Sequence, residues 1–146
     1  MNRKHFIFAL LCVLVSATLW ANPPKKNGNG EGIKFFEGTF AQALAKAKAE
    51  KKLIFLDAYT SWCGPCKMMQ TRTFPDKKLG DFFNQKFVAI KIDMEEGEGP
   101  NLAETYGVDA YPTLFFIDTS GKVVKRVLGF QSAEKLLAQA QSAASK

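Results

Sequence analysis

Cys63 and Cys66 are separated by only Gly64 and Pro65. Two thiols at this spacing can close a small disulfide ring and open it again by thiol–disulfide exchange. Such a small ring stabilises a fold little compared with a disulfide that closes a long loop, so a purely structural role explains the pair poorly. An inert disulfide and one half of a metal site are the alternatives. The pair therefore predicts redox chemistry at a Cys63–Cys66 disulfide.

The two thiols are expected to differ because a helix should begin between them. Pro65 fits the first turn of a helix, where its missing N–H costs nothing. Cys63 would then lie at the helix N-terminus, where free backbone N–H groups and the helix dipole favour a thiolate. Cys66, one turn into the helix, should be partly covered by its own helix. We therefore expect Cys63 to attack a disulfide and Cys66 to resolve the mixed disulfide.

One acidic residue, Asp57, interrupts an apolar run from Leu53 to Tyr59 that ends shortly before Cys63. Burying a carboxylate is costly, and burial raises the pKa of a carboxyl group, so Asp57 could exchange a proton near neutral pH. A partly solvated aspartate at the end of a strand is the alternative interpretation. The sequence thus predicts a proton-handling group close to the two thiols.

A substrate-binding surface is expected around the cysteine pair. Pro112 begins a later strand and donates no backbone hydrogen bond, which leaves the backbone near Tyr111 free to pair with an extended substrate. The side chains of Trp62 and Tyr111 would border this apolar surface, and Gly64 and Pro65 would form part of it. Ordinary packing is the alternative for each aromatic residue.

The spacing of apolar residues predicts the elements that position these groups. Strands are predicted at residues 33–36, 53–59, 87–92, 113–117 and 123–128. Helices are predicted at residues 40–52, from the turn at 61–66 to about 73, at 76–86, from 101 to about 107, and after 132. The early alternation indicates parallel strands, and the late hairpin adds an antiparallel pair. The predicted fold class is therefore α/β, one domain with a mixed sheet covered by helices on both faces.

Three residues are predicted to cap helices. Thr39, with Gln42 three residues later, has the pattern of a capping box at the start of the first helix. Asn101 and Ser132 are the expected caps of two later helices because their side chains can accept hydrogen bonds from free backbone N–H groups.

The N-terminus has the layout of a secretory signal peptide, residues 1–21. Arg3 and Lys4 precede an apolar run from Phe6 to Trp20, which is shorter than the roughly 20 residues of a membrane span. Cleavage after Ala21 would make this an exported, periplasmic protein, and an uncleaved N-terminal anchor is the alternative. A lipid anchor on Cys12 is disfavoured by the bulky residue before it.

Composition then defines the exported chain. Residues 22–32, rich in Pro, Gly, Asn and Lys, are expected to form a flexible linker before a domain at 33–146. Without residues 1–21 the net charge falls from +6 to +4, and its scattered lysines argue against nucleic-acid binding. Removal of His5 and Cys12 leaves two cysteines and no histidine. This set excludes histidine-dependent nucleophilic sites and cannot complete a four-ligand zinc or iron–sulfur site, so no metal or cofactor is expected.

Over roughly residues 33–144 the sequence resembles the thioredoxin family. The resemblance rests on Trp-Cys-Gly-Pro-Cys-Lys at 62–67, the acid six residues before the first cysteine, and Tyr-Pro-Thr at 111–113. The segments at 56–63 and 73–76 also resemble the periplasmic thioredoxin-like domain of transmembrane disulfide reductases. The resemblance implies a thioredoxin fold and activity on protein disulfides. A reductase in an oxidising compartment would need continuous recharging, so we expect a membrane thiol transporter as its electron donor.

The same resemblance assigns roles to two further residues. It implies that Asp57 accepts the proton of Cys66 through a water, and that Pro112 has a cis peptide bond and packs against the cysteines. Catalytic residues by this comparison are Cys63, Cys66, Asp57 and Pro112.

Three positions depart from the family pattern. Thioredoxins commonly carry a lysine near the buried acid where Ala89 stands here, so we expect the surroundings of Asp57 to differ. Gln70 replaces an acid of the related reductase domains. The acidic loop, residues 95–100, is longer than usual, and it lacks the ligand spacing of a known calcium loop.

Three functions remain open. The first is a reductase of disulfides in exported proteins, the second an oxidase or isomerase, and the third a binding module with a passive disulfide. A passive module has no need of the cysteine pair, Asp57 and Pro112. Strong oxidants and isomerases of this superfamily usually carry a histidine beside the second cysteine, and this chain has none there. The sequence therefore favours a reductase, and it contains no evident dimerisation element, so a monomer is expected.

Overall fold

The computed structural model describes residues 31–145, so the expected signal peptide and most of the expected linker lie outside the described residues. The helices and strands follow one another as α1 (Phe40–Glu50), β1 (Leu53–Tyr59), α2 (Gly64–Met68), η1 (Met69–Thr73), α3 (Lys77–Lys86), β2 (Phe87–Asp93), α4 (Gly99–Tyr106), β3 (Thr113–Ile117), β4 (Val123–Leu128) and α5 (Ala133–Ala144). All but η1 are α-helices or strands, and η1 is a π-helical turn.

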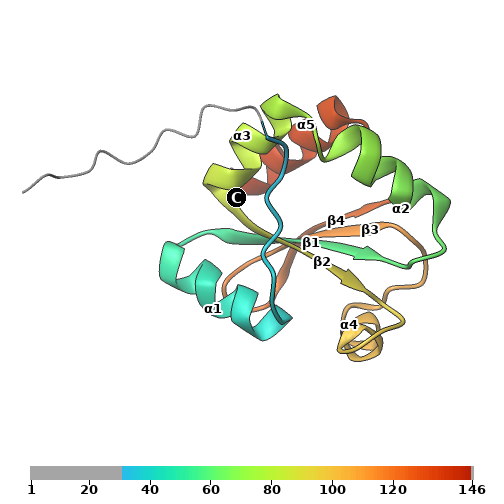
Figure 1. The fold of residues 1–146 in the computed structure, drawn as a ribbon. Coiled ribbons are helices and arrows are strands. Elements are labelled where there is room, and N and C mark those ends of the chain that lie inside the picture. The colour runs from blue at the N-terminus through green and yellow to red at the C-terminus, as the bar shows by residue number, and fades with distance from the viewer. Residues whose placement is uncertain (1–30, 146) are drawn as a thin grey trace, which may run out of the picture.

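Four strands form one mixed sheet in the order β2-β1-β3-β4. β1 pairs parallel with β2 and antiparallel with β3, and β3 pairs antiparallel with β4. Helices α1 and α4 cover one face of this sheet, and α2, α3 and α5 cover the other (Figure 1). The predicted fold class, a mixed sheet between two helical layers, is confirmed.

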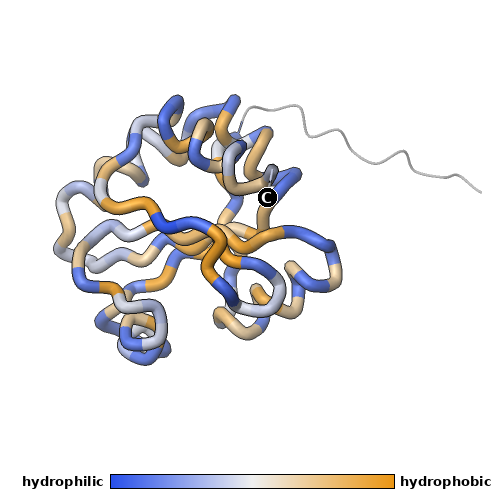
Figure 2. The backbone as a smooth tube through the Cα atoms, turned by 180° about the vertical axis from the view of Figure 1, so that it is seen from behind, coloured by the Kyte–Doolittle hydropathy of each residue, from blue (hydrophilic) through white to orange (hydrophobic). Residues whose placement is uncertain are grey.

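The central strand β1 is buried along nearly its whole length, as the continuous apolar run predicts. Figure 2 shows the hydrophobic residues concentrated in the strands at the centre of the molecule. Phe55 points to the α3–α5 side, where it packs with Phe83 and Phe116, and its neighbour Leu56 points to the α1–α4 side. The core therefore has two layers divided by the sheet.

Local capping signals set most of the helix starts. Thr39 and Gln42 form the predicted capping box, and Ser132 caps α5 as predicted. The prediction that Asn101 caps α4 is wrong, because α4 begins at Gly99 with Glu98 in the cap position. The physical reason is Pro100, which is pre-set for the first turn of a helix and starts it earlier.

The strand predicted at 33–36 is also wrong. Only Phe35 makes a bridge, to Ala89 of β2. The backbone N–H groups of this segment donate to different elements: that of Ile33 to the carbonyl of Phe74, and that of Lys34 to the side chain of Asn84. Because its hydrogen bonds are divided in this way, the segment adds one bridge at the edge of the sheet and does not form a strand.

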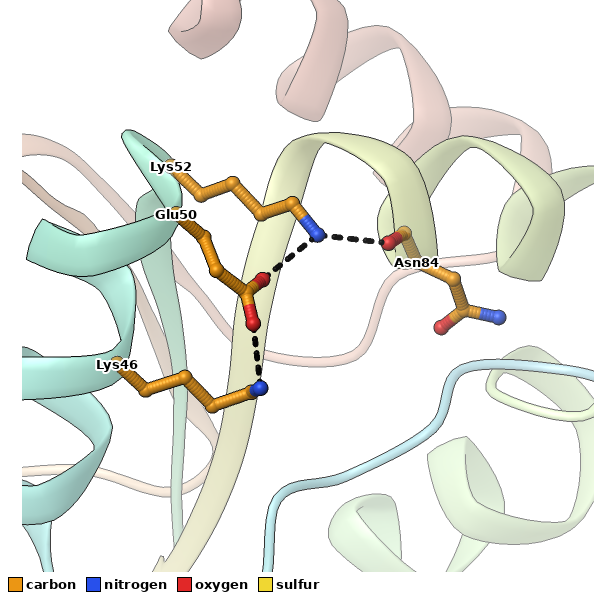
Figure 3. A network of polar contacts seen from close by, with 4 residues as sticks. All are labelled: Lys46, Glu50, Lys52 and Asn84. Carbon is orange, nitrogen blue, oxygen red and sulfur yellow. Dashed lines mark hydrogen bonds and ion pairs between the residues drawn. The ribbon is translucent and has the colours of Figure 1, made fainter. Parts of the chain in front are cut away.

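A polar network ties α1 to the end of α3, on the side of the molecule where β1 and β2 begin (Figure 3). Glu50 forms ion pairs with Lys46 and, at 2.9 Å, with Lys52, whose ammonium also donates to the backbone carbonyl of Asn84 at 3.3 Å. Hydrogen bonds from Lys46 and then Lys52 lower the pKa of Glu50. The network thus joins the two helical layers around the ends of the strands.

Within residues 31–145, no helix is both long and apolar enough to cross a membrane.

Candidate active site

The two cysteines form a disulfide at the start of α2, directly after the turn that leaves β1. Cys63 is the N-cap residue, and its sulfur accepts a hydrogen bond from the backbone N–H of Cys66 at 3.2 Å. Pro65 lies in the first helical turn, as predicted. One N–H group of the helix start is therefore directed at the Cys63 sulfur, and this position at the helix N-terminus favours a thiolate.

The two cysteines differ in burial less than the sequence suggests. Cys66 is 1% exposed, and Cys63 is itself only 3% exposed. In this disulfide form the chemical difference between them therefore lies in the hydrogen bond to the Cys63 sulfur, and not in coverage by the helix.

Helix α2 continues into the π-helical turn η1, which the sequence does not predict. The backbone N–H of Phe74 donates to the carbonyl of Met69, five residues earlier, at 2.8 Å. The hydroxyl of Thr73 donates to the carbonyl of Gln131 at 2.6 Å, so the end of η1 is fixed to the segment between β4 and α5. A π-helical turn widens the helix locally and is frequent near functional sites.

Asp57 is buried as predicted, with 1% of its surface exposed. It follows Phe55 by two residues on β1 and therefore points to the same side of the sheet, the side that α2 and α3 cover. Neither of its carboxyl oxygens has a hydrogen-bond partner among the described residues. Burial raises the pKa of Asp57 from 3.8 to about 7, and the positive charge of Lys91 partly opposes this rise.

Lys91 is a neighbour of Asp57 that the sequence analysis missed. The two residues are direct partners in the parallel pairing of β1 with β2, so their side chains leave the sheet on the same side. The ammonium of Lys91 lies over the ring of Phe35, 5.7 Å from its centre. Lys91 thus acts to lower the pKa of Asp57 from a position two residues after Ala89, which replaces the lysine expected by comparison with thioredoxins. Asp57 and Lys91 are each the fifth residue of their own strand, but only the register of the two strands places them opposite each other.

A cavity of about 210 Å³ opens on this side of the sheet. Lys91 and Gln70 supply two of its polar side chains, and Phe35 and Phe74 supply aromatic walls. Gln70 gives this cavity an uncharged amide.

Trp62 and Tyr111 meet beside the disulfide. Their rings are 5.8 Å apart and nearly perpendicular, and the Trp62 side chain is 63% exposed. The peptide bond between Tyr111 and Pro112 is cis, and Pro112 is buried. The structure therefore brings together the two aromatic residues that were predicted to border a substrate surface, and both Gly64 and Pro65 are exposed next to them.

Two apolar residues on the same side of the molecule were not predicted. Leu128 is 57% exposed and pairs with Thr113, the residue after Pro112. The N–H of Gly129 donates to the carbonyl of Pro112, and the following residue, Phe130, is 39% exposed. The signal available in the sequence was the strand register of the hairpin, which places the end of β4 beside the start of β3.

The acidic loop reaches the site through Glu95, another residue that the sequence analysis did not single out. The indole N–H of Trp62 donates to a carboxylate oxygen of Glu95 at 2.9 Å.

Within residues 31–145, no group of three or more histidine, cysteine or acidic side chains is arranged to hold a metal ion.

Comparison with known proteins agrees with this geometry. Residues 40–144 match the family described as a thioredoxin-like domain. The chain is 35% identical over 107 residues to the thiol:disulfide interchange protein DsbD of Pseudoalteromonas atlantica, covering 70% of this chain and 18% of that protein. It is 32% identical over 96 residues to a thioredoxin of Chlorobaculum thiosulfatiphilum, covering 66% of this chain and 83% of that protein.

Solved structures show the same fold. A solution structure described as "a putative disulphide-isomerase from Bacteroides thetaiotaomicron" is 47% identical, with a TM-score of 0.70, and covers 78% of this chain and 94% of that one. The oxidised C-terminal domain of DsbD from Neisseria meningitidis is 25% identical, with a TM-score of 0.60, and covers 70% of this chain and 90% of that domain. This chain belongs to the family of thioredoxin-like domains and is a thioredoxin-like disulfide oxidoreductase.

Proposed function

We propose that this protein is an exported reductase of protein disulfides. The observation that carries the proposal is the Cys63–Cys66 pair at the start of α2, with a buried carboxyl group on the same side of the sheet that has no hydrogen-bond partner within residues 31–145. The similarity to the DsbD proteins, which are named for thiol:disulfide interchange, supports both the chemistry and an exported location.

The reaction passes through one mixed disulfide. The Cys63 thiolate attacks a sulfur of the client disulfide, and the other client sulfur leaves as a thiolate that takes up a proton. Cys66 then loses its proton to Asp57 and attacks the Cys63 sulfur, which releases the second client thiolate and closes the Cys63–Cys66 disulfide. Two electrons pass from the dithiol to the client, and a membrane thiol transporter returns two electrons to the disulfide.

An oxidase or isomerase is the second candidate, favoured by the name of the Bacteroides structure at 47% identity. The two candidates differ in which form of the cysteine pair is stabilised. A strong oxidant stabilises its thiolate heavily and thereby its reduced form. Here the helix start stabilises Cys63, but an ionised Asp57 opposes a second negative charge, and no histidine lies between or beside the cysteines. These charges favour the disulfide and make the dithiol an electron donor.

The reduction potential decides between these candidates. We expect a value below about −220 mV, nearer to the approximate −270 mV of thioredoxin than to the approximate −120 mV of a strong periplasmic oxidant. Equilibration of the protein with glutathione redox buffers, followed by separation of the two forms, measures it. A potential above about −160 mV would refute the reductase and support the oxidase or isomerase.

The division of labour between the cysteines predicts different defects in two variants. Cys63→Ser should abolish the reduction of insulin, because the attacking sulfur is gone. Cys66→Ser should accumulate mixed disulfides with clients, because the resolving sulfur is gone. In protein that lacks residues 1–21, the single thiol of Cys66→Ser should also alkylate faster at neutral pH than that of Cys63→Ser. Equal alkylation rates would contradict the role assigned to the helix start.

The raised pKa of Asp57 predicts a pH-dependent stability. Both folded and unfolded chains are protonated at this residue below pH 3.8, whereas between 3.8 and about 7 the folded state holds the proton more tightly. The free energy of unfolding of the parent protein should therefore fall as the pH rises from about 4 through 7. Relative to Asp57→Asn, which cannot ionise, the fall should be on the order of 4 kcal/mol. Denaturant unfolding of the oxidised proteins measures this difference, with exposed Asp81→Asn as the control.

The same variant tests proton transfer. Asp57→Asn should reduce insulin more slowly above pH 7, where the carboxylate of the parent protein is ionised and can accept the proton of Cys66. Parallel activity profiles of parent and variant from pH 6 to 9 would leave Asp57 without this role.

Export predicts a processed N-terminus. Protein isolated from the envelope of the native cell should begin near Asn22, because the short apolar run is typical of a cleaved signal peptide. N-terminal sequencing checks this directly. Membrane-bound protein that still begins at Met1 would show that the segment is an anchor.

A further inference from the structure

Trp62 is the most exposed large hydrophobic residue of the described chain, yet its side chain contacts two other side chains. Its indole N–H donates to Glu95 at 2.9 Å, and its ring meets the ring of Tyr111 at 87°. An exposed tryptophan without such contacts would exchange among rotamers, and a client would have to immobilise it on binding. The two contacts hold the indole in one place beside Cys63 before any client arrives.

The backbone around Glu95 is itself well fixed. The N–H of Met94 donates to the carbonyl of Tyr59 at the end of β1, at 2.8 Å. The N–H of Glu95 donates to the side chain of Asp93 at 3.0 Å. The loop is therefore attached to the same strand end that leads to the cysteines, which keeps the carboxylate of Glu95 in register with the indole.

The far end of the acidic loop is also anchored. Glu98 accepts a hydrogen bond from the backbone N–H of Phe40, at 2.7 Å, and so ties the loop to the start of α1. A side chain at Gly99 would overlap the backbone carbonyl of Asp93, so the loop closes tightly on itself. These contacts fix the backbone on both sides of Glu95, while its carboxylate faces the indole of Trp62.

We propose that Glu95 is a positioning residue that holds Trp62 in the client-binding surface. It acts through the indole and touches neither sulfur, so it should affect the capture of a polypeptide client and not the chemistry of disulfide exchange. The inference rests on the proposed activity on protein disulfides, and it names a determinant of client binding on the acidic loop.

Three variants separate the hydrogen bond from the charge. Glu95→Ala removes the acceptor and the charge, whereas Glu95→Gln removes the charge and keeps an acceptor oxygen. Glu96→Ala is the matched control, because Glu96 is an exposed acid of the same loop whose carboxylate has no hydrogen bond or ion pair among the described residues. An effect of charge alone would appear equally in Glu95→Gln and Glu96→Ala.

The first measurement follows the indole directly. The N–H resonance of Trp62 in nitrogen–proton spectra can be assigned by its loss in Trp62→Phe. We expect this resonance to shift and its hydrogen to exchange faster with solvent in Glu95→Ala, with a smaller change in Glu95→Gln and none in Glu96→Ala. An indole that behaves alike in Glu95→Ala and Glu96→Ala would overturn the proposal.

The second measurement follows the client. Glu95→Ala should raise KM for insulin about three- to tenfold, the range expected for loss of one hydrogen bond, with kcat within about twofold of the parent. Its rate with a small aliphatic disulfide should stay within about twofold, and Glu95→Gln should restore most of KM. A fall in kcat with unchanged KM, or equal losses with both substrates, would contradict a role in positioning.

A failure of the Glu95 proposal can be distinguished from a failure of the reductase proposal. If the parent protein oxidises polypeptides instead of reducing them, the same KM comparison is made with a reduced polypeptide, and Glu95→Ala should again raise it. The indole measurement needs no turnover at all. The reduction potential thus tests the direction of electron flow, and these variants test Glu95 in either direction.

Discussion

β1 lies between two other strands and under helices on both faces, so the carboxyl group of Asp57 is cut off from water. β1 is also held in place, because it is hydrogen-bonded to β2 on one side and to β3 on the other. The cost of ionising this carboxyl group is therefore built into the sheet, and within the described part of the chain the nearby cation of Lys91 reduces that cost. The sheet thus keeps an acid whose proton is exchangeable near neutral pH.

The same strand also fixes where the sulfurs lie. β1 ends at Tyr59, and a short turn leads from it to Cys63, the cap of α2. Asp57 and the disulfide are therefore positioned by one continuous stretch of chain, with only a short turn between the end of β1 and Cys63. Of the two aromatic residues, Trp62 belongs to this same stretch, whereas Tyr111 precedes β3, so their meeting depends on how the strands pair.

Most features encoded locally could be predicted from the sequence, whereas two contacts that depend on strand register and on loop folding could not. The bounds of β1 and the capping box at Thr39 follow from apolar runs and from residues three apart, and both are confirmed. The approach of Lys91 to Asp57 depends on strand register, and that of Glu95 to Trp62 depends on how a loop folds back. In both pairs more than thirty residues separate the partners along the chain, and no local pattern records their meeting.

The segment that enters the domain also has a consequence for its association with other molecules. β2 is an edge strand, and the unpaired backbone groups of an edge can pair with a strand of another chain. Phe35 forms a bridge to Ala89, and the N–H of Phe36 donates to the carbonyl of Ala89, so part of this edge is already occupied. The residues that lead into the domain therefore act as a cover against intermolecular sheet extension and aggregation.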